Sequence, residues 1–95
     1  MRNTSSHRYR IPEGVLRARL EGEEVMLNPD SGVYHLLNDT GRSLTLLFDD
    51  GRSLEEAAVA LAEKTGAPMD RVERDVRSFV DAMLERHLLE EVPAQ

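Results

Sequence analysis

Residues 31–41, SGVYHLLNDTG, contain the change from strand to helix that decides the fold. Val33–Leu37 is a short run of β-branched, aromatic and leucine residues, which favour an extended strand. Ser31 and Gly32 before it are turn formers, and the polar run Asn38–Thr40 after it can cap the start of a helix. The sequence therefore predicts a strand over residues 33–37 that is followed directly by a helix.

Two further strands are predicted upstream of this one. In VLRARLE, residues 15–21, apolar residues occupy every second position from Leu16 to Leu20 and arginines lie between them, which is the pattern of a half-buried strand. A turn around Gly22 leads to EVMLN, residues 24–28, which resumes the alternation. The three strands are expected to form an antiparallel meander, with residues 33–37 at one edge.

Downstream of residue 38 the apolar residues change to helical spacing. A first helix is expected to end before Gly51, and SLEE at residues 53–56 is the signature of a capping box for a second helix. A third helix is expected to begin near Pro68 and to run to about Leu88. The predicted fold class is α+β: a three-stranded antiparallel sheet followed by three helices, similar in layout to a winged helix-turn-helix with its strands first.

Length and composition predict one small domain. The chain has 95 residues, no cysteine and a net charge of −6. Residues 1–10 are polar and lack periodicity, so they are expected to form a flexible arm before a domain over residues 11–91, with 92–95 as a tail. No apolar run reaches the length of about 18 residues that a membrane helix needs, and no signal peptide is visible. A cytoplasmic protein without membrane contact is expected.

Motifs for catalysis and for metal or cofactor binding are missing from the sequence. His7, His35 and His87 lie far apart in the chain and have no cysteine partner, so no metal site is expected. Glycine-rich nucleotide loops and nucleophile elbows do not occur either. The sequence therefore predicts a protein that is not an enzyme and binds no cofactor.

Nucleic-acid binding is the alternative function that the predicted layout raises. The third helix would be the recognition helix, but its arginines alternate with aspartate and glutamate, and the chain as a whole is acidic. Unpaired carboxylates face phosphates unfavourably, so we expect no nucleic acid as partner. A winged-helix DNA-binding or regulatory module is kept as the alternative.

The strand at Val33–Leu37 lacks the lysine, proline or inward charge that usually protects an edge strand. Either the helices cover it, or its edge stays open for a guest strand or for a second copy of the chain.

The apolar face of the third helix also allows two interpretations. Its core stripe includes Val76 and Met83, and Val80 and Leu84 widen it. That wider face can be core or the wall of a groove.

The spacing of several residues resembles the PqqD-like family, which is named after a pyrroloquinoline quinone biosynthesis protein and is also called the RiPP precursor peptide recognition element. The resemblance covers about residues 15 to 91 and rests on the following elements: Gly32-x-Tyr34-x-x-Leu37-Asn38-x-x-Gly41, Asp50-Gly51 before a capped helix, Asp75-Val76, Phe79 and a Leu88-Leu89 ending. One departure is His87, where many relatives have a glycine that would allow the helix to stop at a positive φ.

The resemblance implies a non-catalytic domain that binds the leader segment of a ribosomally made precursor peptide and delivers it to a modifying enzyme or leader peptidase. The pathway would be of the lasso peptide type or one that uses a radical SAM enzyme. Independently of the resemblance, the chain is expected to be a monomer or a weak homodimer. The leader would add antiparallel to the third strand and pack on the third helix. On this sequence the implied peptide-binding residues are Val33, Tyr34, His35, Leu36, Leu37, Asp75, Val76, Phe79, Val80 and Met83.

Overall fold

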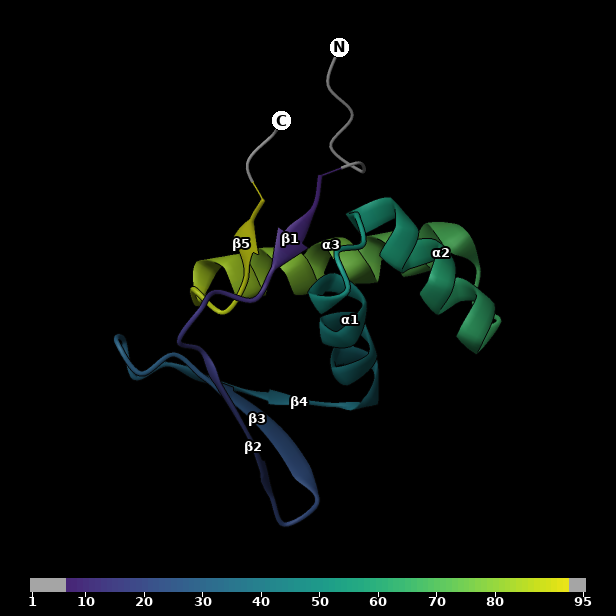
Figure 1. The fold of residues 1–95 in the computed structure, drawn as a ribbon. Coiled ribbons are helices and arrows are strands. Elements are labelled where there is room, and N and C mark those ends of the chain that lie inside the picture. Colours follow the sequence, from purple (N-terminus) through teal and green to yellow (C-terminus); the bar gives the residue numbers. More distant parts are fainter. Residues whose placement is uncertain (1–6, 93–95) are drawn as a thin grey trace.

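The computed structural model describes residues 7–92 of the 95. A three-stranded sheet lies beside three helices, and a second sheet joins the two ends of the described chain (Figure 1). The elements in chain order are β1 (Tyr9–Arg10), β2 (Leu16–Leu20), β3 (Glu23–Leu27), β4 (Tyr34–Leu37), α1 (Asp39–Asp49), α2 (Leu54–Thr65), α3 (Met69–Glu85) and β5 (Glu90–Glu91). The predicted meander and the three predicted helices are therefore confirmed.

The three-stranded sheet has the order β2-β3-β4 with antiparallel neighbours, so β4 is an edge strand as predicted. A tight turn with a bulge joins β3 to β4. The Gly32 amide donates to the Asn28 carbonyl at 2.8 Å, and the Asn28 amide donates to the Val33 carbonyl at 2.9 Å. Gly32 has φ +75°, a conformation that its lack of a Cβ makes inexpensive. This turn sets the register in which Leu27 faces Tyr34 and Met26 faces His35.

The apolar face of β2 points away from the helices, and the prediction of a half-buried strand is wrong. Leu16 and Leu20 expose 54% and 61% of their surface. The helix-facing side of the sheet instead carries Met26, which is fully buried, and an ion pair of 2.8 Å between Arg17 and Glu24. The alternation does place these leucines on one face, but that face is the outer one.

The helices begin where the sequence places their caps. The Asn38 side chain accepts from the Gly41 amide at 2.7 Å at the start of α1. Ser53 and Glu56 form the predicted capping box, with hydrogen bonds of 3.1 and 2.9 Å between side chain and backbone. Gly66 ends α2 in the left-handed conformation. Each cap satisfies amide groups or carbonyls that the helix itself leaves unpaired.

The third helix ends at Glu85, three residues before the expected Leu88, and it stops without a glycine. His87 adopts φ +58° itself. Its amide donates to the Leu84 carbonyl at 3.1 Å and the Leu88 amide to the Met83 carbonyl at 2.9 Å, the paired bonds of a left-handed helix stop. The His87 carbonyl also accepts from the Asn28 side chain at 2.9 Å, which ties the β3–β4 turn to the end of α3.

The core lies between the helices and extends to both small sheets. Its buried apolar residues are Tyr9, Met26, Leu37, Leu44, Phe48, Leu54, Ala57, Ala58, Leu61, Val72, Val76, Val80, Met83, Leu88 and Leu89. The three helices supply most of this set, whereas the three-stranded sheet supplies only Met26 and Leu37. The β2–β3 hairpin reaches away from the helices (Figure 1), which explains why its side chains contribute so little to the core.

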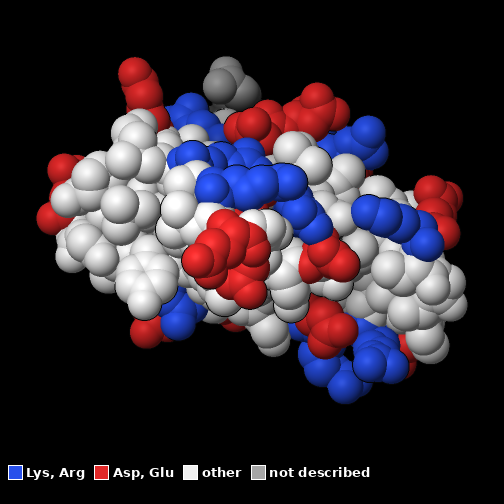
Figure 2. Space-filling view, turned by 90° about the horizontal axis from the view of Figure 1, so that it is seen from below, with Lys and Arg blue, Asp and Glu red and all other residues white. Residues whose placement is uncertain are grey.

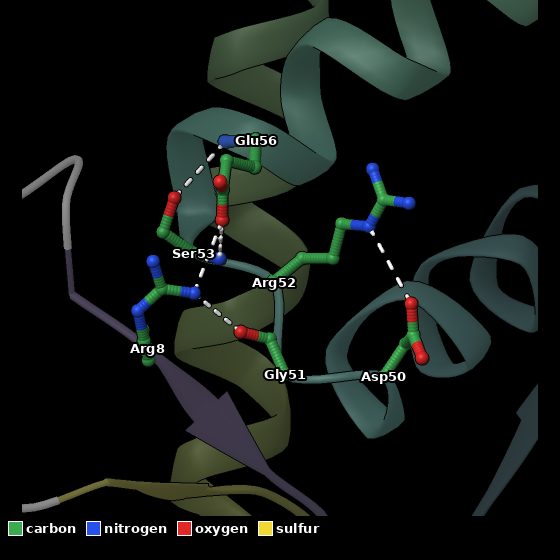
Figure 3. A network of polar contacts seen from close by, with 6 residues as sticks. All are labelled: Arg8, Asp50, Gly51, Arg52, Ser53 and Glu56. Atoms are coloured by element: carbon green, nitrogen blue, oxygen red, sulfur yellow. Dashed lines mark hydrogen bonds and ion pairs between the residues drawn. The ribbon is translucent and has the colours of Figure 1, made fainter.

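The expected flexible arm over residues 1–10 is wrong for residues 7–10; residues 1–6 lie outside the described part. Tyr9 is only 6% exposed, its strand pairs with β5, and its ring meets Phe48 edge-on at 5.7 Å between centroids. The Arg8 guanidinium donates to the Gly51 carbonyl and pairs with Glu56 at the start of α2 (Figure 3). The domain therefore begins before residue 11, and most of the expected tail, residues 93–95, is not described.

Candidate functional site

The outer edge of β4 is the most unusual feature of the backbone. Among residues 7–92 no strand pairs with this edge, because β3 is the only neighbour of β4 in its sheet. The hydrogen bond from Asn28 to Val33 sets the phase of the ladder. Backbone groups of an antiparallel strand point alternately to the two sides, so His35 and Leu37 face β3. Tyr34 and Leu36 consequently direct their N–H and C=O groups to the open edge.

Side chains of β4 alternate between the two faces of the sheet. Tyr34 and Leu36 lie on the outer face and expose 66% and 53% of their surface. Leu37 is buried against the helices, and His35 is half-buried on that same side. The strand thus combines an open backbone edge with apolar side chains that no part of the described chain covers.

Phe79 of α3 forms the wall beside the inner face of β4. Its ring meets His35 edge-on, with centroids 6.3 Å apart. Gly41 at the start of α1 lies under the same ring, since a Cβ added there would stand 3.3 Å from Phe79 Cε1 and 3.2 Å from a Leu37 methyl. Phe79 is held from two sides and remains partly exposed. The end of β4, the start of α1 and the middle of α3 therefore meet at one aromatic ring.

The structure separates the ten predicted site residues into a surface group and a core group. Val76, Val80 and Met83 are almost completely buried, so the widened stripe of α3 is core at these positions. Asp75 is exposed one turn before Phe79, and Val33 is exposed beside the β3–β4 turn. Leu37 joins the core group at 6% exposure. The predicted residues that remain at the surface are Val33, Tyr34, Leu36 and Asp75, with His35 and Phe79 partly exposed.

On the helix-facing side of β4, burial and one arginine determine the charge state of His35. Burial lowers the pKa of His35, and the nearby positive charge of Arg86 lowers it further. His35 is thus held neutral at pH 7, as suits a ring packed against Phe79. Gly41 was noted only as part of the family spacing, and neither Gly41 nor Arg86 was predicted as a site residue. A glycine inside a helical pattern was the available signal, because it often marks close approach by another side chain.

The described residues also bear on metal, membrane and nucleic-acid contact. In residues 7–92 no group of three or more histidine, aspartate or glutamate side chains is arranged to hold a metal ion. None of the helices in that range is both long and apolar enough to span a membrane. Seen from below, acidic and basic side chains are intermixed rather than gathered into areas of one sign (Figure 2). That face lacks the continuous positive surface typical of duplex binding.

The architecture defines a class of small α+β domains in which a three-stranded sheet leaves one edge open beside a helix. Residues 23–89 match the family described as coenzyme PQQ synthesis protein D (PqqD), and the chain belongs to this family. The family assignment confirms the resemblance inferred from the sequence.

Three similar proteins extend the comparison. A PqqA binding protein of Rhizobium meliloti (strain 1021) is 32% identical over 75% of this chain and 70% of its own length. The structure of TbiB1 in complex with the TbiA(beta) leader peptide is 29% identical, with a TM-score of 0.77 over 90% of this chain and 99% of that one. A lasso peptide synthetase B1 complexed with the leader peptide is 26% identical, with a TM-score of 0.76 over 90% and 98%. These two structures confirm the predicted fold class.

Proposed function

We propose that this protein binds the leader segment of a ribosomally synthesised precursor peptide and delivers it to the enzyme that processes it. The observation that carries the proposal is the open edge of β4, where the backbone groups of Tyr34 and Leu36 face outward beside Phe79. The similarity of the whole domain to two proteins solved with leader peptides supports it. The protein itself would perform no chemistry.

The proposed binding mode is addition of the leader as a further antiparallel strand. Main-chain hydrogen bonds to Tyr34 and Leu36 supply affinity, and alternate guest side chains supply selectivity. Guest residues on the inner side meet Phe79, His35 and Asp75. Guest residues on the outer side lie next to the exposed Tyr34 and Leu36 side chains. The inner contacts favour apolar or aromatic anchors because the neutral His35 and Phe79 rings form that wall.

A lasso peptide pathway is the proposed setting, with a radical SAM pathway as the alternative. A lasso peptide synthetase B1 and TbiB1, each solved with a leader peptide, match over 90% of this chain. The alternative is kept because another relative is a PqqA binding protein. The partner enzyme would be a separate leader peptidase or a modifying enzyme. We expect the complex to work in the cytoplasm, where a chain without cysteine needs no oxidising compartment.

The test is a fluorescence anisotropy titration of the purified protein with the labelled leader peptide encoded beside its gene. A labelled DNA duplex serves as the second ligand, and both titrations are run at low and high salt. Saturable peptide binding that changes little with salt is expected, since an apolar groove is weakly screened. Duplex binding that falls steeply with salt, together with a silent peptide, would favour the winged-helix alternative.

A further inference from the structure

The outer face of the β2-β3-β4 sheet is a second apolar surface. It lies opposite the face that carries the buried Met26 and Leu37, and the hairpin that forms most of it projects away from the helices (Figure 1). A shallow hollow of about 540 Å³ runs over it. The hollow is lined by Leu16, Ala18, Leu20, Glu21, Glu23, Val25, Leu27, Tyr34 and Leu36.

This surface has the properties of a binding face rather than of an ordinary solvated one. Seven of its nine lining residues are apolar or aromatic, and all three strands contribute to it. The polar ion pair of the sheet, Arg17 with Glu24, lies on the opposite, helix-facing side. Large exposed apolar patches rimmed by polar residues mark interaction sites for proteins, membranes or ligands.

The charges around the hollow restrict what can cover it. Its only charged residues, Glu21 and Glu23, are both acidic and lie at the tip of the β2–β3 hairpin, and no lysine or arginine lines it. If a second copy of the chain covered the hollow, Glu21 and Glu23 of both copies would lie around the same apolar area. Each copy would also carry a net charge of −6, so the two would repel each other. A covering element that is apolar along its length and basic at one end fits the charges better.

The same surface continues into the open edge of β4. Tyr34 and Leu36 point their backbone groups toward the edge and their side chains into the hollow. A leader added at the edge would extend the sheet and place half of its own side chains on this outer face. Any protein seated in the hollow would therefore touch the bound leader as well.

We propose that the outer sheet face docks the leader-processing enzyme, through an apolar segment of that enzyme with lysine or arginine at the end that meets Glu21 and Glu23. This inference rests on the proposed leader-binding function and assigns a separate surface to the enzyme. The hollow binds this apolar segment of the enzyme, and the β4 edge binds the leader. The enzyme is thereby held against the strand that it must act on.

The test compares two double variants of the full chain. Leu16→Lys with Leu20→Lys places two positive charges in the hollow, on the strand farthest from the β4 edge. Leu46→Lys with Val59→Lys is the matched control, because these side chains are also exposed, at 57% and 43%, but lie on α1 and α2. Binding of the labelled leader peptide and of the purified processing enzyme from the same gene cluster is measured separately for each variant, the latter by biolayer interferometry.

The hollow variant is expected to bind the enzyme at least tenfold more weakly and to keep its leader affinity within twofold, whereas the control keeps both. Glu21→Lys with Glu23→Lys leaves the apolar residues in place and is expected to weaken enzyme binding as well. Wild-type enzyme affinity in the hollow variant overturns the inference. So does a wild-type dimer in sedimentation velocity that this variant converts to monomer. A wild type that binds no leader would contradict the proposed function instead.

Discussion

Replacing Leu36 with proline removes one outward N–H group from β4 and leaves the ladder between β4 and β3 in place. The alternation of backbone groups directs the Leu36 amide to the open edge, whereas the His35 amide faces Met26 of β3. Proline is tolerated on an edge strand where its missing N–H would face solvent. The Leu36→Pro protein is therefore expected to fold, and His35→Pro is expected to destabilise the sheet.

The effect on leader binding follows from the loss of one intermolecular hydrogen bond. Such a bond contributes about 1 kcal/mol net, and a guest carbonyl left unpaired in the interface adds a further penalty of similar size. A total of about 1 to 2 kcal/mol raises the dissociation constant by about 5- to 30-fold. Leu36→Ala is the control, because it shortens the same half-exposed side chain but keeps the N–H group.

The assay is the anisotropy titration with the labelled leader peptide, accompanied by urea unfolding of each variant. Leu36→Ala reports the contribution of the side chain, and the difference between alanine and proline reports the backbone donor. A folded Leu36→Pro protein with the same affinity as Leu36→Ala would refute strand addition at this edge. The leader would then have to bind elsewhere, although leader binding itself would still stand.

Three further predictions concern stability. Tyr9→Ala should lower the free energy of unfolding, measured by urea titration, by about 3 kcal/mol, because a buried ring that packs on Phe48 is lost. A decrease below about 0.5 kcal/mol would mean that residues 7–10 are not part of the fold. His87→Gly should raise the free energy of unfolding by about 0.5 to 1 kcal/mol, since glycine adopts φ +58° without strain, and a lower urea midpoint would contradict this. The folded protein holds the pKa of His35 below 6.5, so the unfolded chain takes up a proton first as the pH falls, and stability should decrease below about pH 6.5. His35→Gln should flatten this dependence in unfolding curves between pH 7.5 and 5.5, and an equally steep curve would exclude His35 as its source.

Local signals in the sequence were sufficient for most of the fold. The Asn38 cap and the Ser53–Glu56 capping box are short-range interactions, so the residues that make them can be recognised within four positions of one another. Gly32 likewise marks the turn into β4. The edge position of β4 followed from chain order, because a meander leaves its first and last strands at the edges.

Long-range contacts account for what the sequence did not reveal. β1 and β5 are only two residues long each and pair across the full length of the domain, so neither carries a periodic pattern. His87 takes the left-handed conformation because the contacts around it, including the Asn28 side chain, outweigh the cost of a non-glycine residue there. Whether Val80 was core or groove depended on where the other helices lie, and they bury it.

The sequence by itself determined which side chains share a face of the sheet, since the period of two is a property of every extended strand. Leu16 and Leu20 were correctly grouped on one face. Only the tertiary structure decided which face meets the helices. The chain leaves β4 at Asn38 directly into α1, on the side of Met26 and Leu37, so the helices pack there and the other face stays open. The alternating pattern is the same whether the apolar face of β2 points toward the helices or away from them, so the sequence alone does not distinguish the two arrangements.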